Sequence, residues 1–358
     1  MGKYKVYVYA ICKNEEQFAA RWMRSMQEAD NVYVLDTGSS DRTVEKLLSL
    51  GAHVTQEIIA PFRFDTARNR SLALVPPDGD ICVCTDLDEC FLPGWRQKVE
   101  DAWAQGADQL RYKYVWNFTE TGQEDTVFYA DKIHARNGFS WVHPVHEVLQ
   151  FDLGTPRRAL AAGVQLNHYP DPQKSRAQYL PLLELSVAEC PDNDRNMHYL
   201  GREYFFHGQW DKCIYTLKQH LALPSAAWHD ERCASHRYIA RAYGEKGSES
   251  EQERHLLFAC GEAPHLREPW MDLAHFAYAR MDWPQLLYAC ERALKIHDRP
   301  RTYMTEGACY GALPYDLLAV ACFHLGLKQR AQEAIDAALA YEPGNERFQQ
   351  NKAWIEKM

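Results

Sequence analysis

Two aspartates, Asp86 and Asp88, stand where an apolar run that begins near residue 80 turns acidic. Carboxylates at this spacing can point toward one divalent cation, because Mg²⁺ and Mn²⁺ prefer oxygen ligands in proteins. A bound cation would relieve the repulsion by which neighbouring carboxylates raise one another's pKa. The acidic segment could instead form a solvated turn before a helix near Pro93. The tripeptide alone leaves both interpretations open.

A second polar cluster, "VLDTGSSDRT" (residues 34–43), places Asp36 after a β-type run and before a turn of small residues. A carboxylate here could contact a ribose or a base, and the N–H groups that open the next helix could bind an anion. The segment lacks the G-x-G-x-x-G motif of dinucleotide sites and the G-K-[ST] of P-loops. A helix cap by Ser40 or Asp41 would explain half of the pattern without any ligand.

Both clusters belong to a region, up to about residue 170, in which short β-type runs alternate with amphipathic segments. The first expected helix, residues 14–27, has Asn14 as its cap. The expected strands are residues 4–12, 31–36, 52–58 and 80–86. This alternation predicts a parallel sheet covered by helices, and such sheets bind ligands beyond the carboxyl ends of their strands. Residues 110–168 are expected to add antiparallel or mixed strands.

After Pro172 the pattern becomes helical. Small residues recur at equivalent positions, at intervals of 39, 34 and 45 residues: Gly201, Ala240, Ala274 and Ala319. Helix pairs of about this length are typical of tetratricopeptide repeats, which stack into a solenoid with a concave surface. The repeats could bind a peptide or partner, or only support the first half, and a homodimer through them is a further possibility. We therefore predict two domains, residues 1–172 and 173–358.

The composition is that of a folded globular protein, since 46% of the 358 residues are hydrophobic and 25% are charged. The net charge of −9 argues against general binding to nucleic acid or anionic lipid. Because the sequence has neither an apolar run of about 18 residues nor a signal-peptide pattern, we expect a cytoplasmic protein without a membrane span. The eleven scattered cysteines are expected to be reduced thiols.

Four segments, in this order and at these spacings, resemble family 2 glycosyltransferases of the GT-A fold: "AICKNEE", "VLDTGSSDRT", "FDTARNRSL" and "CTDLDE". The resemblance extends to the branch with a tetratricopeptide tail, which includes the bacteriocin S-glycosyltransferases. The motifs cover roughly residues 4–168. The resemblance implies a Rossmann-like mixed α/β domain followed by an all-α repeat domain. It also implies inverting transfer of a hexose, expected from a UDP-hexose, to a peptide, protein or glycan acceptor with Mn²⁺ or Mg²⁺ as cofactor.

The resemblance assigns the nucleotide pocket to the first and third motifs and to Asp36. Asp36 would contact the uracil or ribose, and the strand end from Ala10 to Lys13 would line the pocket. Arg68 would contact the nucleotide or the diphosphate, and Asp65 would help to hold the nucleotide in place.

The metal and the diphosphate are assigned to the D-x-D aspartates and to two later residues. Asp88 would bind the cation, while Asp86 would face the ribose or the donor sugar. His168 matches a late histidine that many GT-A enzymes use as a further metal or diphosphate contact, and Lys174 could also meet phosphate. A cation at this place would neutralise the charge that develops on the departing nucleoside diphosphate.

The candidate catalytic base is Glu147, in "WVHPVHE" (residues 141–147). Members of this branch carry a His-Glu pair near this position, which His146 and Glu147 match, and inversion requires a base that deprotonates the acceptor. The chain lacks the Glu-Asp motif that holds the base in many family 2 enzymes. His143 and His146 could instead simply pack beside Trp141.

Two alternatives come from other functional classes. One is a metal-dependent hydrolase that needs no sugar nucleotide, built from Asp86, Asp88, His143, His146 and His168. The other is an adaptor that binds a partner through the repeats while its transferase half is inactive.

Overall fold

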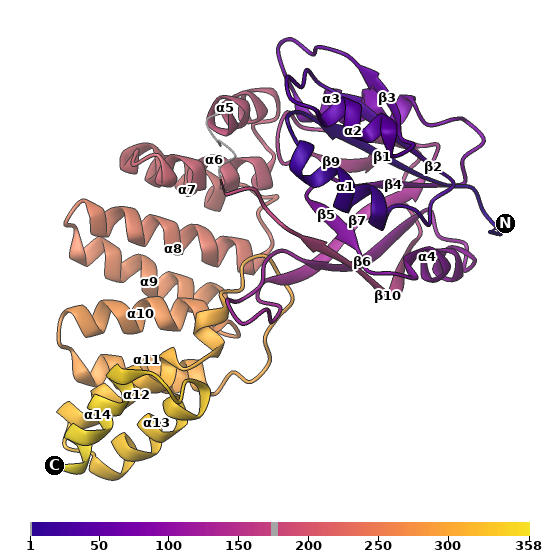
Figure 1. Cartoon of the computed structure of the whole chain (residues 1–358). Helices are drawn as coiled ribbons and strands as arrows, with labels where there is room; N and C mark the ends of the chain where they lie inside the picture. The colour runs from indigo at the N-terminus through magenta and orange to yellow at the C-terminus, as the bar shows by residue number, and fades with distance from the viewer. Residues whose placement is uncertain (1, 173–177) are drawn as a thin grey trace. The chain divides into compact units, whose positions relative to one another are not determined.

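The computed structural model describes residues 2–172 and 178–358, and the chain divides into two compact units, Met1–Ser186 and Val187–Met358. The first unit contains a mixed sheet with helices, and the second is helical (Figure 1). The predicted fold class, an α/β domain followed by an all-α repeat domain, is confirmed. The boundary between residues 172 and 173 stays a prediction, because residue 173 lies outside the described part of the chain.

The first unit is built on a sheet that has eight strands among the described residues, in the order β3-β2-β1-β4-β7-β6-β10-β5. The strands are β1 (Val6–Cys12), β2 (Asn31–Asp36), β3 (His53–Gln56), β4 (Ile81–Cys84), β5 (Glu89–Phe91), β6 (Gln109–Val115), β7 (Val127–Ala135) and β10 (Arg158–His168). Neighbours among the first four strands are parallel, whereas β7 is antiparallel to both β4 and β6. A separate hairpin pairs β8 (Phe139–Val142) with β9 (Val148–Phe151).

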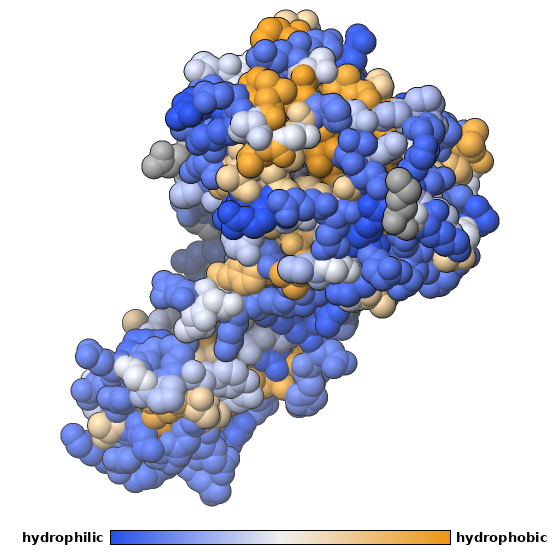
Figure 2. Space-filling view, turned by 45° about the vertical axis from the view of Figure 1, so that its right-hand side comes forward, coloured by the Kyte–Doolittle hydropathy of each residue, from blue (hydrophilic) through white to orange (hydrophobic). Residues whose placement is uncertain are grey.

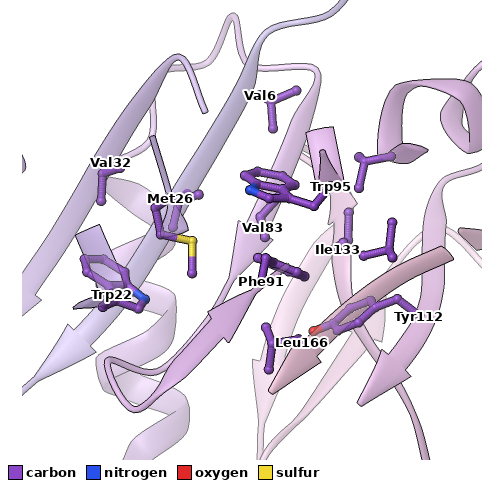
Figure 3. Packing of buried hydrophobic residues seen from close by; sticks show 14 of the residues in the cluster. Val6, Trp22, Met26, Val32, Val83, Phe91, Trp95, Tyr112, Ile133 and Leu166 are labelled. Carbon is purple, nitrogen blue, oxygen red and sulfur yellow. The ribbon is translucent and has the colours of Figure 1, made fainter. Parts of the chain in front are cut away.

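The central strands β1 and β4 are buried on both faces of the sheet because their alternate residues are apolar on each side. On one face Val6 and Val83 pack with Trp22 of α1 (Glu16–Ser25) and Trp95 of α4 (Trp95–Trp103) (Figure 3). On the other face, tyrosine and cysteine side chains of β1 and β4 pack with Leu72 of α3 (Phe64–Ala73). The described cysteines are free thiols, as predicted.

The expected cap of the first helix is wrong. The helix α1 has Glu15 at its N-cap, while Asn14 has a positive φ of 55°. The Asn14 side-chain oxygen accepts a hydrogen bond from the backbone N–H of Ser40, 2.7 Å away, just before α2 (Thr43–Ser49). Asn14 therefore links the loop after β1 to the loop after β2 instead of starting a helix.

The short strand β5 is absent from the sequence-based expectations. It pairs antiparallel with β10, so that Cys90 lies opposite Asn167. The acidic segment after β4 thus crosses to another strand of the sheet rather than running directly into the helix near Pro93. This crossing carries Asp88 to the end of β10.

The second unit consists of packed helix pairs. The helices of the C-terminal region are α5 (Tyr179–Glu189), α6 (Asp194–Phe206), α7 (Trp210–Ala222), α8 (His229–Glu245), α9 (Glu249–Glu262), α10 (Arg267–Ala279), α11 (Trp283–Leu294), α12 (Leu313–His324), α13 (Lys328–Tyr341) and α14 (Glu346–Glu356). In the unit that begins at Val187, consecutive helices pack as α6 with α7, α8 with α9, α10 with α11 and α12 with α13 (Figure 1). The four recurring small residues are buried, one in the first helix of each pair, as the repeat pattern predicts.

Hydrophilic residues cover most of the visible surface in the space-filling view, and hydrophobic residues form separate patches (Figure 2). Within the described ranges, none of the helices has the length and apolar character that crossing a membrane requires.

Candidate active site

Asp86 lies just beyond β4, between two basic side chains. Nη2 of Arg68 is 2.9 Å from its Oδ1, and Nζ of Lys132 is 3.5 Å from its Oδ2. The Asp86 side chain keeps 33% of its surface exposed, whereas that of Arg68 keeps 6%. The compensating charge that the sequence analysis assigned to a metal ion is therefore supplied, for Asp86, by the protein itself.

Asp88 is paired with His168, which ends β10. Oδ2 of Asp88 lies 3.5 Å from Nε2 of His168, and both side chains are largely buried. Nδ1 of His168 donates to the carbonyl oxygen of Trp116 at 2.9 Å, so in the neutral ring Nε2 carries the lone pair. Burial by itself would lower the pKa of His168, but the hydrogen bond and the charge of Asp88 outweigh burial and raise it.

The residues present fit a cation that is shared with a ligand. In the described part of the chain, no group of three or more His, Cys, Asp or Glu side chains is arranged to hold a metal ion. Asp88 and His168 can supply two ligands, and Mg²⁺ commonly takes one or two carboxylates together with substrate phosphates. A histidine that binds a metal usually donates its other ring N–H to a carboxylate, a backbone carbonyl or a water, and His168 donates in this way to a backbone carbonyl.

Glu89 and Lys132 form a buried pair beside Asp86 that the sequence analysis missed. Nζ of Lys132, on β7, is 2.7 Å from Oε1 of Glu89, and the hydroxyl of Tyr114 donates to the same oxygen at 2.7 Å. Burial raises the pKa of Glu89, against the opposing charge of Lys132. Burial would lower the pKa of Lys132, but Glu89 and Asp86 raise it. Lys132 therefore remains a cation next to the D-x-D segment.

Arg68, on α3, joins Asp86 to Glu147. Its Nε donates to Oε1 of Glu147, its Nη1 lies 3.3 Å from the sulfur of Cys84, and Nη2 donates to Asp86. The guanidinium carbon lies 5.1 Å from the ring centre of Trp141. Burial would lower the pKa of Arg68, but the charges of Asp86 and Glu147 raise it well above its usual range. Each nitrogen of the guanidinium thus has a protein partner.

The segment that carries Glu147 is held against α3 by its backbone. The amide of Asn69 donates to the carbonyl of Trp141 and accepts from its N–H, each at 2.8 Å. The N–H of Phe64 donates to the carbonyl of Pro144 at 2.9 Å. His143 and His146 have positive φ values of 79° and 51°, a conformation that is uncommon for non-glycine residues.

The predicted nucleotide residues lie around the carboxyl ends of β1 and β2. Asp36 is fully buried, and its carboxylate accepts hydrogen bonds from the N–H groups of Gly38 and Ser39, so it stabilises its own loop. Ala10 is fully buried within β1, whereas Lys13 is exposed just beyond it.

The remaining predicted residues are Asp65 and Lys174. The side chain of Asp65 pairs with Arg63 at 2.7 Å. Lys174 lies outside the described residues. The network around the D-x-D segment thus contains Arg68, Asp86, Glu89, Lys132 and Glu147, and Asp88 pairs with His168 beside it.

Residues 7–160 match the family model of glycosyl transferase family 2. This part of the chain is a glycosyl transferase family 2 domain, which supports glycosyltransferase activity. The recognition made from the four motifs is confirmed. No curated protein matches the sequence significantly.

Several solved structures are similar to the helical part of the chain. A structure of the MamA protein is 15% identical, with 46% of this chain and 81% of that chain covered and a TM-score of 0.36. YrrB, described as a TPR protein with an unusual peptide-binding site, is 11% identical, with 49% and 82% covered and a TM-score of 0.40. The yeast Tom70 structure is 13% identical, with 52% and 37% covered and a TM-score of 0.38.

Proposed function

We propose that the protein is an inverting, metal-dependent glycosyltransferase. It moves a hexose from a nucleotide diphosphate sugar, with UDP-hexose as the expected donor, to a peptide, protein or glycan acceptor. The family 2 domain supports the reaction class. The observation that carries the donor and metal proposal is the pairing of Asp88 with His168 at 3.5 Å, beside the Arg68 and Asp86 ion pair.

Asp88 and His168 are the residues that would hold Mn²⁺ or Mg²⁺. When bound, the cation would neutralise charge on the diphosphate leaving group. On the other side of the D-x-D segment, the protein's own cations neutralise carboxylate charge. Arg68 pairs with Asp86, and Lys132 pairs with both Asp86 and Glu89. Asp86 keeps a third of its side-chain surface exposed, so it can accept hydrogen bonds from donor hydroxyl groups.

Glu147 is the proposed base. Its carboxylate would take the proton of the acceptor hydroxyl or thiol as that atom bonds to the anomeric carbon and the carbon–oxygen bond to the diphosphate breaks. Arg68 contributes by holding the carboxylate at a defined place beside Asp86. Arg68 is thereby a positioning residue, and the diphosphate contact that the family resemblance implies would require it to leave these partners.

The test uses the full chain with a panel of UDP-, GDP- and dTDP-sugars, with and without Mn²⁺. We expect one donor to raise the melting temperature and to be turned over only with the cation. A ligand at 100 times its Kd adds about 2.7 kcal/mol to the unfolding free energy. Asp88→Asn should abolish both effects, and Glu147→Gln should abolish turnover while donor binding persists. Asp101→Asn, on the exposed side of α4, is the control. Failure of every donor to stabilise the wild type would overturn the proposal.

The same panel separates the alternatives. A hydrolase would act without a sugar nucleotide, and the described residues provide no group of three ligands that would hold its metal. An adaptor would keep its biological activity in Asp88→Asn.

A cytoplasmic location, the absence of a nucleic-acid partner and a homodimer through the repeats complete the proposal. The net charge of −9 supports the absence of a nucleic-acid partner.

A further inference from the structure

Trp116 follows β6 directly and covers the ring of His168. The two ring centres are 4.2 Å apart with an interplanar angle of 20°, and the Trp116 carbonyl accepts the Nδ1 hydrogen bond of His168. Trp116 therefore contacts, through both its ring and its backbone, the histidine that faces Asp88. Nevertheless 47% of Trp116 is exposed. A large apolar ring is thus left open beside the pair proposed to hold the diphosphate.

The position of this indole is set by the residues behind it. Tyr114, two residues earlier on the same face of β6, stacks against Phe128 with ring centres 4.9 Å apart and lies 6.3 Å from Trp116. Tyr114 is buried, and its hydroxyl is bonded to Glu89. Trp116 is consequently the exposed end of an ordered aromatic stack rather than an isolated surface residue.

We propose that the exposed face of Trp116 is the stacking platform for the hexose of the donor, an inference that rests on the proposed function. A hexose presents ring C–H groups on its apolar face, and the electron-rich face of an indole is complementary to them. In a sugar nucleotide the hexose is bonded directly to the terminal phosphate. If Asp88 and His168 hold that phosphate through a cation, the hexose is the first ring that comes within reach of Trp116.

The other rings of the reaction have different expected places. The nucleobase is assigned to the loop of Asp36, at the end of β2, and the acceptor approaches Glu147, which is held on the Arg68 and Asp86 side. Among the described residues, the rings that contact Trp116 are those of Tyr114 and His168. Neither ring belongs to the Asp36 loop or to the segment that carries Glu147. The donor hexose is therefore the occupant that the contacts of Trp116 favour.

The experiment compares each sugar nucleotide with its own nucleoside diphosphate. Binding of UDP-glucose, UDP-N-acetylglucosamine and UDP, each with Mn²⁺, is measured by calorimetry on the full chain, together with GDP-mannose and GDP. For the sugar nucleotide that binds the wild type best, Trp116→Ala should weaken binding about 10-fold or more, as expected for loss of a stacking ring. Binding of the bare diphosphate should change less than about 2-fold, and Trp116→Phe should retain most of the affinity. Trp354→Ala, which removes a 53% exposed indole from α14, is the matched control.

Each outcome decides the matter. Preferential loss of sugar nucleotide binding in Trp116→Ala supports the inference. Equal loss for the diphosphate and its sugar would place the indole against the nucleobase or phosphate and overturn it. Unchanged binding of the sugar nucleotide in Trp116→Ala would show that the indole does not contact the donor hexose and would also overturn it. If the wild type binds none of the probes, the proposed function fails together with the platform. Should Trp116→Ala unfold, Trp116→Leu against Trp116→Phe makes the same comparison.

Discussion

Arg68 and Asp86 form an ion pair in which Nη2 of the buried Arg68 lies 2.9 Å from Oδ1 of the partly exposed Asp86. The same guanidinium holds Glu147 through its Nε. One side chain of α3 thus ties the end of β4 to the segment that carries the proposed base. This relationship makes Arg68 a structural requirement of the site, whatever ligand the site binds.

Replacing Arg68 by Met should lower the free energy of unfolding by about 3–5 kcal/mol, because the largely buried Glu147 and the partly exposed Asp86 lose their shared cation. The matched control is Arg70→Met on the same helix. The Arg70 side chain is 64% exposed and lies 3.7 Å from Glu57, so this change should cost less than about 1 kcal/mol. Urea denaturation measures both variants. Equal effects would mean that the Arg68 ion pairs do not stabilise the fold.

Asn69→Ala should lower the free energy of unfolding by about 2 kcal/mol, because the buried N–H and C=O of Trp141 both lose their partner. Asn31→Ala is the control, since the Asn31 side chain forms its hydrogen bond with the exposed His53 at the edge of the sheet. This control should change stability by less than about 0.5 kcal/mol. Thermal unfolding distinguishes the two, and a stable Asn69→Ala would show that Asn69 is not what holds Trp141.

Two helical glycines should respond in opposite directions to alanine. A Cβ at Gly201 would overlap the fully buried side chain of Leu217, so the packing would have to shift and Gly201→Ala should destabilise by about 1–3 kcal/mol. A Cβ at Gly261 meets no atom within 4 Å, so Gly261→Ala should stabilise by about 0.5–1 kcal/mol. Chemical denaturation of both variants provides the test. A stabilising Gly201→Ala would contradict the close packing of α6 on α7.

The helical unit should lose stability between pH 7 and pH 5. The pKa of His198 is lowered to about 3, and the pKa values of His236 and His255 are lowered to about 4. Burial is the largest cause in each case. These rings stay neutral in the folded state, while the unfolded chain binds protons below about pH 6.5, so folding weakens as pH falls. Each ring accounts for about 2 kcal/mol at pH 5. In the first unit, the raised pKa of His168 acts in the opposite direction.

Denaturation of the full chain at the two pH values measures this loss. His255→Gln should reduce the pH dependence, whereas the exposed His53→Gln should leave it unchanged. An unfolding free energy that is the same at pH 7 and pH 5 would contradict the neutral burial of these histidines.

The features that could be predicted are those with a local signal. The strand and helix alternation up to β4 follows from periodicity within about ten residues, and it correctly placed Asp36 and Asp86 at the carboxyl ends of their strands. The four buried small residues of the repeats were found for the same reason. The family resemblance rested on four short motifs, each contiguous in sequence.

The features that could not be predicted depend on contacts between distant residues. Lys132 is a single lysine in a strand, and only the pairing of β7 beside β4 brings it to Asp86 and Glu89. The strand β5 has three residues, too few for a periodic signal, and is defined by its pairing with β10. For the same reason, the pairing of Arg68 with Asp86 and Glu147 has no signal in the sequence.

From its sequence alone, this chain is an α/β domain with a D-x-D segment at a strand end, followed by helical repeats, because side-chain periodicity and short motifs are local properties. Only the tertiary structure decided which charge compensates each carboxylate: Arg68 and Lys132 for Asp86, and His168 for Asp88. The reason is physical. An ion pair depends on the distance between two atoms in space, and residues far apart in the chain acquire that distance only when the sheet assembles.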